Sequence, residues 1–301
     1  MSMFTTAYIN KHLGNFLDFT PDLYRYKKCE NKFKELCKIY NIESAHDCTA
    51  HENIYFKTIS YTTYANMFIM HPLNFQASFD QIMDARADDV VVHDYASAVR
   101  TAQEKRGGKY RANFLKVERD MNSVAVLPGN NKFEQHLCTV KLKQLVDENP
   151  KLIVKPHPLS DNELMSRIRE LVPAEQLASR MENLYSLIHQ AELVYSTHLS
   201  ETALTSLVLG KEIEPLDKFH MKLQGSFSHI NHVLYTALEP IKEINKIISS
   251  PKSGIINLDI DVDWEYKMEQ YIKHVMAKRA KEKGRYIYGH VRKAEHRSSN
   301  L

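Results

Sequence analysis

Lys155 and His157 follow a short apolar stretch and form the strongest chemical signal in the sequence. Residues 152–154 are typical of a buried strand, and Pro156 and Pro158 stiffen the next loop by fixing φ and removing donors. A lysine and a histidine at the carboxyl end of a strand can both be held toward one anion. The pattern therefore predicts a phosphate or diphosphate site. The alternative is an ordinary strand exit with a solvated lysine and a packed histidine.

A second group of polar residues follows another apolar run, residues 192–196. Ser196 and Thr197 place hydroxyls after the expected strand, and Ser200 has the residue type of a helix N-cap. Free backbone N–H groups at a helix start bind anions. A carboxylate such as that of Glu201 accepts hydrogen bonds from ribose hydroxyls in nucleotide-binding folds. The group predicts a second anion site, and the alternative is a capped helix whose glutamate complements the dipole.

Short apolar runs alternate with amphipathic segments from residue 123 onward. The sequence predicts strands at residues 123–127, 152–154 and 192–196 and helices at residues 132–149, 161–171 and 200–209, the last ended by Gly210. This alternation indicates a parallel sheet covered by helices on both faces. Because parallel strands share one carboxyl edge, we expect the Lys155 and Ser200 groups to face one ligand there.

The order of these motifs resembles the donor domain of GT-B glycosyltransferases of the capsule-polysaccharide, Kdo-transferase and bacterial sialyltransferase type. The resemblance lies in a strand, Lys-Pro-His-Pro, a helix, a strand and Ser-Thr-x-x-Ser-Glu, and it covers residues 123–216. It departs from the families' Gly-Lys-Pro at residues 210–212, which read Gly-Lys-Glu. It implies a nucleotide-sugar co-substrate, with a UDP-sugar favoured, and no metal or other cofactor. The implied phosphate ligands are Lys155, His157, Ser196, Thr197 and Ser200, with Glu201 on the ribose.

We expect the whole chain to be an α/β protein of the GT-B type, with two Rossmann-like domains facing a cleft. Its 301 residues suit two compact domains. In the first half of the chain, the pattern of apolar residues predicts a helix at residues 22–40 and strands at 53–61, 66–70 and 89–93. Paired glycines at 107–108 indicate a nearby boundary. The expected domains are an acceptor-side domain at 1–120, a donor domain at 121–262, and a closing helix with a basic tail at 263–301.

An inverting sugar transfer needs a base that takes the proton of the acceptor hydroxyl. In GT-B folds this base comes from the first domain, across the cleft. Asp94 follows the apolar run at residues 90–92 and is the leading candidate, with His93 beside it. Asp80 and His71 are the other candidates. A transfer that retains configuration needs no such base.

The last thirty residues are strongly basic. Between residues 273 and 297, nine lysines and arginines stand against two glutamates, a net charge of +7, whereas the whole chain carries +3. Tyrosines at 286 and 288 add rings that stack on bases, so the segment favours a polyanion. The residues expected to contact it are Lys278, Arg279, Lys281, Lys283, Arg285, Arg292 and Lys293.

Double-stranded DNA is the acceptor that this tail favours. The chain is similar in style to the small GT-B enzymes that glucosylate or arabinosylate hydroxymethylated pyrimidines in T-even-like bacteriophage DNA, which act in the host cytoplasm on a flipped base. Three alternatives stay open: a capsule or lipopolysaccharide glycosyltransferase whose tail lies on a membrane surface, a nucleic-acid-binding protein without catalysis, and a solvated tail. No obligate protein partner is indicated.

Composition argues against several other classes. No stretch approaches the ~18 uncharged apolar residues of a membrane span, and residues 1–19 lack a secretory pattern, so we expect a cytoplasmic protein. The four cysteines have no CxxC spacing, which argues against disulfides and structural zinc. The alternating acids at 259–263 resemble a metal motif. Trp264 stands where an EF-hand needs glycine, so we expect a solvated strand face instead.

Overall fold

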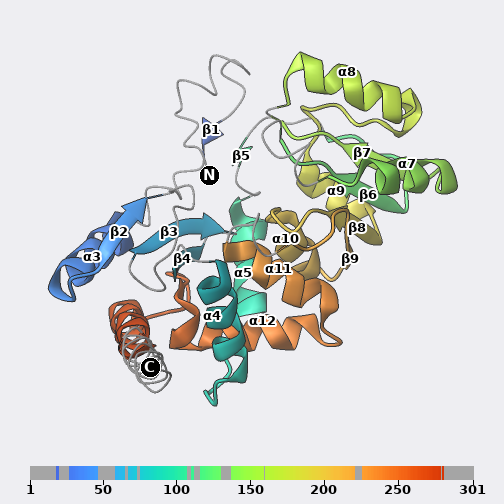
Figure 1. Cartoon of the computed structure of the whole chain (residues 1–301). Coiled ribbons are helices and arrows are strands. Elements are labelled where there is room, and N and C mark those ends of the chain that lie inside the picture. Colours follow the sequence, from blue (N-terminus) through green and yellow to red (C-terminus); the bar gives the residue numbers. More distant parts are fainter. Residues whose placement is uncertain are drawn as a thin grey trace, which may run out of the picture.

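Two four-stranded sheets organise the described part of the chain, with helices between them and on their outer faces (Figure 1). This computed structural model describes residues 18–19, 27–46, 58–64, 67–72, 75–106, 110–111, 116–129, 137–158, 160–220, 226–278 and 280. A further two-stranded antiparallel sheet joins β1 (Asp18–Phe19) to β5 (Tyr110–Arg111). The α/β class expected from the sequence is confirmed.

The second half of the chain forms a wholly parallel sheet in the order β7-β6-β8-β9. Its strands are β6 (Ser123–Val126), β7 (Leu152–Lys155), β8 (Leu193–Ser196) and β9 (Glu212–Pro215). The helices that follow them are α7 (Thr139–Glu148), α8 (Asn162–Leu171), α9 (Leu184–Gln190) and α10 (Thr202–Val208), with a 3₁₀ turn, η2 (Ala174–Gln176). β6, β7, β8 and the helices α8 and α10 lie where the sequence predicts them, α7 covers the later part of the helix expected at 132–149, and β9 and α9 were not predicted.

Both faces of this sheet are apolar, as parallel strands require. On one face Ala125 and Val154 pack with Leu142 of α7 and Ile168 of α8. On the other face Val124 belongs to the cluster that contains the apolar side of α9. The central strand β6 is therefore buried between two helical layers, and only the loops at the strand ends are placed to meet a ligand.

The first half of the chain contributes a mixed sheet in the order β10-β4-β3-β2. Its strands are β2 (Glu43–His46), β3 (Thr58–Tyr64), β4 (Met67–Pro72) and β10 (Ile255–Ile256). β2 and β3 are parallel, whereas β4 is antiparallel to both of its neighbours. The Rossmann-like first domain expected from the sequence is not what the described residues show, because a Rossmann sheet is mostly parallel.

Helices from both halves of the chain share one core beside the mixed sheet. They are α4 (Phe75–Ala87), α5 (Tyr95–Arg106), α11 (Ser226–Thr236) and α12 (Pro240–Ser249), followed by a 3₁₀ turn, η4 (Pro251–Ser253). Leu204 of α10 packs in this core with Met67 of β4 and Ile230 of α11. The helical layer therefore joins the two sheets, as Figure 1 shows.

The opposite face of the mixed sheet is covered by α3 (Lys27–Ile39) and by a helix over residues 264–278. Phe33 of α3 and Tyr271 of the later helix pack in one cluster with Phe68 of β4. Residues 226–256, which the sequence assigned to the donor domain, therefore pack with the mixed sheet. The expected boundary at residue 262 does not coincide with a change of core.

Residues 89–93, predicted as a strand, have no regular secondary structure. The apolar run faces solvent, with Val91 79% and Val92 48% exposed. Apolar residue type indicated a strand here, but no neighbouring strand pairs with the segment. Within the described residues, no helix combines the length and the apolar character needed to cross a lipid bilayer.

Candidate functional site

The carboxyl edge of the parallel sheet brings the predicted motifs to one level. Val126 of β6 stands in register with Lys155 of β7 and with Ser196 of β8, and Ser196 with Pro215 of β9. Residues two positions past each strand end are therefore level with one another. They include His157 after β7, and His198 and Asp217 after β8 and β9.

Lys155 points into the fold and not toward a ligand. Its residue is 1% exposed, and Nζ donates to the backbone carbonyls of Pro156 at 2.8 Å and Arg180 at 2.9 Å. Burial lowers the pKa of Lys155 to about 7; the charge of Glu182 opposes this shift, and that of Arg180 adds to it. The sequence-based assignment of Lys155 as a phosphate ligand is therefore wrong for this arrangement, in which the lysine anchors the segment before α9.

Glu182, whose charge acts on Lys155, forms an ion pair with Arg119. Arg119 Nε and Nη2 donate to the two carboxylate oxygens of Glu182 at 2.6 and 2.8 Å, in the bidentate geometry that arginine favours. The Glu182 side chain is 2% exposed. Arg180, two residues earlier, donates to the Ser160 carbonyl in the loop after β7. Arg180 thus places a cation beside this loop, which the sequence alone did not indicate.

His157 is half-buried and leans over the loop that follows β6. A Cβ on Gly129 would lie 3.4 Å from His157 Nδ1, so the imidazole contacts the glycine where a side chain would otherwise stand. The absence of a side chain at Gly129 lets the imidazole of His157 approach the loop after the central strand. His157 is thus placed at the strand-end edge where the motif predicts an anion.

The three hydroxyl-bearing residues at the end of β8 and after it differ in burial. Ser196 is fully buried, and its Oγ lies 2.7 Å from the Tyr235 hydroxyl, which also donates to the Ser196 carbonyl at 2.9 Å. Thr197 is 1% exposed. Ser200 is half-buried, and its Oγ accepts the Thr202 N–H at 3.2 Å. Of these three residues, only Ser200 is partly exposed.

The helix start at this point differs from the predicted one. Glu201 is the N-cap of α10, and its side chain makes no capping hydrogen bond. α10 has only seven residues, so its dipole is short, and a carboxylate already stands at its positive end. The prediction that Ser200 caps the helix and that the helix start binds an anion is therefore corrected. Glu201 remains half-buried at the edge.

A histidine–aspartate pair that the sequence reasoning missed lies beside these hydroxyls. His198 Nδ1 and Asp217 Oδ1 are 2.7 Å apart, and the same oxygen accepts the His198 backbone N–H at 3.0 Å. Asn231 Nδ2 donates to the carbonyls of His198 at 2.7 Å and Ser200 at 2.9 Å, which fixes the loop to α11. Both members of the pair stand two residues past a strand end, and this spacing was the available signal.

Three further rings surround His198. The Tyr235 ring meets it edge-on with centroids 4.9 Å apart, and Phe219 and His232 lie at 5.4 and 5.8 Å. Phe219 stacks on His232 at 4.0 Å. Burial and the neighbouring His198 lower the pKa of His232, and burial raises the pKa of Tyr235. The imidazole of His198 is thus held in a largely aromatic shell.

The predicted catalytic base is absent from this edge. Asp94 is an exposed N-cap of α5: it accepts from Ser97 N at 3.2 Å and from Ser97 Oγ at 2.5 Å, and the hydrogen bonds from Ser97 lower its pKa. Asn245 of α12 also donates to it, at 3.3 Å. Asp94 thus bonds to α5 and α12 and to none of the predicted donor ligands, so its assignment as base has no geometric support.

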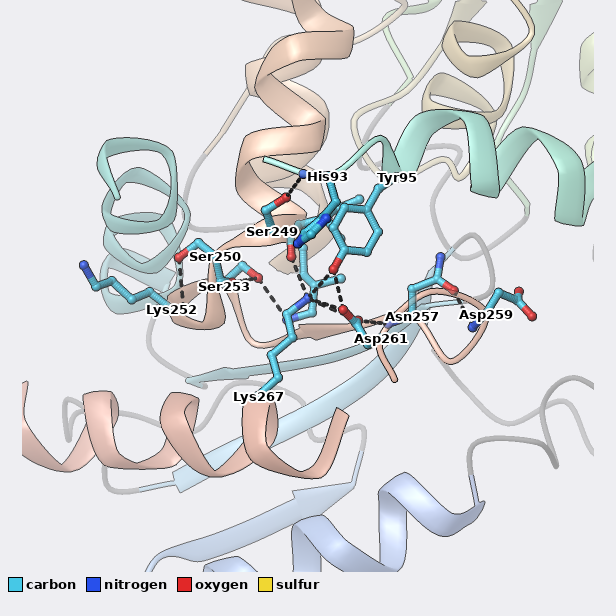
Figure 2. Close-up of polar contacts among 12 residues, drawn as sticks. His93, Tyr95, Ser249, Ser250, Lys252, Ser253, Asn257, Asp259, Asp261 and Lys267 are labelled. Atoms are coloured by element: carbon cyan, nitrogen blue, oxygen red, sulfur yellow. Dashed lines mark hydrogen bonds and ion pairs between the residues drawn. The ribbon is translucent and has the colours of Figure 1, made fainter. Parts of the chain in front are cut away.

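His93 belongs to a neighbouring group of polar contacts, which Figure 2 shows. Its backbone N–H donates to Ser249 Oγ at 2.9 Å, and its ring meets Tyr95 edge-on at 6.1 Å. Tyr95 in turn donates to Asp261, which pairs with Lys267 at 3.0 Å. Asp261 was expected on a solvated strand face; its side chain is instead 6% exposed in a loop.

The two remaining base candidates lie on the mixed-sheet side. Asp80 accepts from Gln76 at 2.8 Å along α4. His71 of β4 has Nδ1 3.1 Å from the Pro72 carbonyl oxygen and lies close enough to His229 of α11 to lower its pKa. Asp80 and His71 thus belong to α4 and β4 and not to the loops at the carboxyl edge of the parallel sheet.

The first residues of the basic segment make ion-pair contacts with the protein, among them Lys273 with Glu269 at 2.9 Å. Lys278 forms an ion pair with Asp84 of α4, and His274 lies 3.4 Å from the same carboxylate. Arg279 and the residues from Lys281 to Lys293 that were expected to contact the acceptor lie outside the described residues. Lys278 therefore holds the helix over residues 264–278 against α4.

No metal site appears in the part of the chain that the structure describes, where no three His, Cys, Asp or Glu side chains are grouped to hold an ion. A shallow hollow of about 540 Å³ lies against α7 and Leu171, and no predicted site residue lines it. No protein-family model matches the chain, and no curated protein is significantly similar to it in sequence. The carboxyl edge of the parallel sheet therefore remains the candidate site on its geometry alone.

Proposed function

We propose that this protein is a glycosyltransferase that holds a nucleotide-sugar donor over the carboxyl end of β6. The observation that supports this most directly is His157 leaning over Gly129 from one side of β6, with the Ser200 segment on the other side. Ligands of parallel α/β sheets bind at this edge. The motif order resembles that of GT-B donor domains, which is the reason for choosing a nucleotide sugar over other phosphorylated ligands.

The spacing of the strands suits a diphosphate. Neighbouring strands lie ~4.8 Å apart, so β7 and β8 are roughly 10 Å apart across β6. His157 reaches inward over Gly129 and narrows this gap. In the proposal, its imidazole donates to one phosphate, the Ser200 hydroxyl donates to the next, and Arg180, which donates to the Ser160 carbonyl, supplies positive charge beside the loop after β7. Fixed donors of this kind stabilise the departing phosphate.

The supporting residues have a different role. Lys155 and Ser196 are buried and make hydrogen bonds to the protein itself. They fix the loops after β7 and β8, so that His157 and Ser200 keep their positions. Glu201 stands next to Ser200 at the same edge and is the proposed ribose ligand, with UDP as the first nucleotide to test.

Donor binding is tested by thermal stabilisation of the full chain with UDP-, CMP- and GDP-sugars. A ligand at 100 times its Kd stabilises the fold by about 2.7 kcal/mol, which raises Tm measurably. His157→Ala should weaken binding of the best donor by about tenfold or more, since it removes a hydrogen bond to a charged group. His189→Ala, an exposed histidine on α9, is the matched control and should bind as the wild type does. Lack of stabilisation by every donor would refute the proposal.

For the acceptor, we propose hydroxymethylated cytosine in double-stranded DNA, which places the reaction in a bacterial cytoplasm. The support is the net charge of +7 between residues 273 and 297. Lys278 is engaged with Asp84, so the charges available to a polyanion come from the residues after it. Phosphates bind lysine and arginine, and this binding weakens steeply with salt.

The acceptor proposal is tested by sugar transfer to DNA with and without hydroxymethylcytosine. Truncation before residue 264 is unsuitable, because Met268 and Tyr271 are fully buried in the core. Neutralising Lys283, Arg285, Arg292 and Lys293 to glutamine in the full chain should instead reduce DNA affinity and lower the salt slope by up to about 0.9 per lost phosphate contact. Transfer only to glycans, or DNA binding with no transfer from any donor, would identify the alternative functions.

A further inference from the structure

His198 and Asp217 form a buried pair that donor binding does not explain. The imidazole Nδ1 and the carboxylate Oδ1 are 2.7 Å apart, and the two side chains are 3% and 4% exposed. Asp217 Oδ1 also accepts the backbone N–H of His198 at 3.0 Å, so the carboxylate fixes both the ring and the chain that bears it. With Nδ1 bound to a carboxylate, the tautomer that carries its proton on Nδ1 is favoured and Nε2 is left as the basic nitrogen.

The second oxygen of Asp217 indicates a role beyond packing. Asp217 Oδ2 is buried and has no hydrogen-bond partner among the described residues. A buried carboxylate oxygen without a partner costs free energy, and such groups in native structures call for an explanation. A charged carboxylate is well suited to stabilise a positive charge on the imidazole next to it. The arrangement is thus unfavourable for a structural histidine and favourable for one that becomes protonated during a reaction.

The pair lies on the β8 side of the proposed donor site, across β6 from His157. His157 follows β7 and leans over β6, whereas Asp217 follows β9, at the opposite end of the strand order β7-β6-β8-β9. His198 therefore faces α11 and the helical layer that joins the two sheets, through its contacts with Tyr235 and Asn231. Two imidazoles consequently lie on opposite sides of the proposed donor site, one beside the phosphates and one toward the mixed sheet.

We propose that His198, oriented by Asp217, is the general base of sugar transfer; this rests on the proposed function. The acceptor hydroxyl gives its proton to His198 Nε2 while its oxygen forms a bond to the anomeric carbon. The bond from that carbon to the donor phosphate breaks, and its electron pair leaves with the nucleoside diphosphate. Asp217 keeps the Nδ1 proton and stabilises the imidazolium, which then releases its proton to water.

The charged and titratable groups around His198 come from two elements. Asp217 follows β9, and His232 and Tyr235 belong to α11. His232 carries a lowered pKa and Tyr235 a raised one, so both stay neutral near pH 7. Asp217 is the carboxyl group in contact with the His198 ring. Because a general base must start without the proton that it takes, transfer should lose activity on the acidic side.

The test compares full-length His198→Gln and Asp217→Asn with His220→Gln, an exposed histidine three residues beyond Asp217. Each is assayed for UDP-sugar binding by thermal stabilisation and for kcat of transfer between pH 5 and 9. We expect His198→Gln to bind donor within about threefold of the wild type and to lose about 10²- to 10⁴-fold in kcat, with its acidic limb abolished. Asp217→Asn should retain UDP-sugar binding, lose less kcat than His198→Gln, and shift the acidic limb of the pH profile. The control should match the wild type.

Chemical rescue distinguishes loss of the base from loss of the fold, because added imidazole can replace the missing side chain only in a folded variant. Imidazole added to His198→Ala should restore part of kcat, with a pH dependence that follows the free base. Near-wild-type kcat in His198→Gln, or an unchanged acidic limb, would overturn the inference while leaving donor binding intact. Failure of the wild type to bind any nucleotide sugar would instead overturn the proposed function, and the inference with it.

Discussion

Lys155 shows how burial decides the chemistry of a single side chain. Its position at a strand end suggested a phosphate ligand, yet Nζ is used by two backbone carbonyls inside the fold. Burial lowers its pKa from 10.5 to about 7. Folding therefore favours the neutral lysine, and the effect on stability depends on pH.

Replacing Lys155 with methionine tests this coupling. Between pH 7 and 10.5 the unfolded chain holds a proton at Lys155 that the folded chain releases, so the free energy of unfolding rises with pH. The wild type should therefore gain a few kcal/mol relative to Lys155→Met as the pH rises from 7 to 10.5, and the two curves should run parallel below pH 7. Urea unfolding at a series of pH values measures the difference. Lys151→Met, at an exposed lysine, is the control; a wild-type curve parallel to that of Lys155→Met between pH 7 and 10.5 would contradict the mechanism.

Asp94 gives a second prediction at the residue scale. As the N-cap of α5 it accepts two hydrogen bonds from Ser97. Asp94→Ala should lower the free energy of unfolding by about 1 kcal/mol, whereas Asp94→Asn, which can still cap, should lower it by only a few tenths. Denaturant unfolding checks both. If the asparagine variant is as unstable as the alanine variant, the negative charge rather than the cap is what matters.

The sequence predicted where the motif residues lie better than where their side chains point. His157 and Ser200 stand at the strand-end edge, because an apolar run followed by polar residues is a local signal. The direction of Lys155 depends on Arg180, 25 residues later, and on the Glu182 charge behind it. Asp217 is 19 residues from His198. Contacts at such separations leave no periodic trace in one sequence.

At the scale of elements, Gly254 determines whether β10 can join the mixed sheet. Its φ is +68°, a left-handed conformation, and a Cβ there would lie 2.4 Å from the Met70 carbonyl oxygen. The Met70 N–H donates to the Gly254 carbonyl at 2.8 Å, so the two chains pass close together. Only glycine fits both the conformation and the space.

Gly254→Ala should therefore destabilise the fold by several kcal/mol, since backbone atoms of β4 would have to move. Gly210→Ala is the matched control. Gly210 also has a positive φ, +75°, but a Cβ there would meet only the Arg100 guanidinium at 3.5 Å, so strain alone should cost about 1 kcal/mol. Thermal or urea unfolding separates the two variants. Equal losses would show that the close approach to Met70 contributes nothing.

Three strands of the parallel sheet and two of the mixed sheet, β3 and β4, lie where the sequence predicts strands, whereas β9, β2 and β10 were not predicted. β6, β7 and β8 are apolar runs between amphipathic helices, and this alternation is local. β10 has two residues, 255 and 256, and pairs with β4 almost two hundred positions earlier. The apolar run at 89–93 resembles a strand but finds no partner strand. Strand pairing over such distances is set by the whole fold.

For the molecule as a whole, Lys267 links three separate parts of the chain. Its Nζ donates to Asp261 at 3.0 Å, to the Ile248 carbonyl at 2.6 Å, and to the Tyr95 hydroxyl at 3.3 Å (Figure 2). The side chain is 11% exposed, and burial lowers its pKa. Lys267 therefore joins the helix over residues 264–278 to α5 and α12.

A double-mutant cycle on Asp261 and Lys267 tests whether this pair is needed for docking of the helix. Removing one partner of a buried pair typically costs 3–5 kcal/mol, because the other charge is left uncompensated. Asp261→Asn should cost more than Lys267→Met, since Asp261 keeps hydrogen bonds from Asn257 N and Tyr95, whereas Lys267 keeps only neutral acceptors. Asp263→Asn, an exposed control, should stay within about 0.5 kcal/mol of the wild type.

The double variant shows whether the ion pair stabilises the fold or whether each charge only offsets the cost of burying the other. If the two charges mainly neutralise each other, the double variant should be more stable than Asp261→Asn, because no unpaired charge stays buried. Urea unfolding of the four proteins measures the coupling free energy. Additive losses would mean that Lys267 and Asp261 act independently. The helix over residues 264–278 would then be held by its apolar face, Met268, Tyr271 and Ile272, and not by the ion pair.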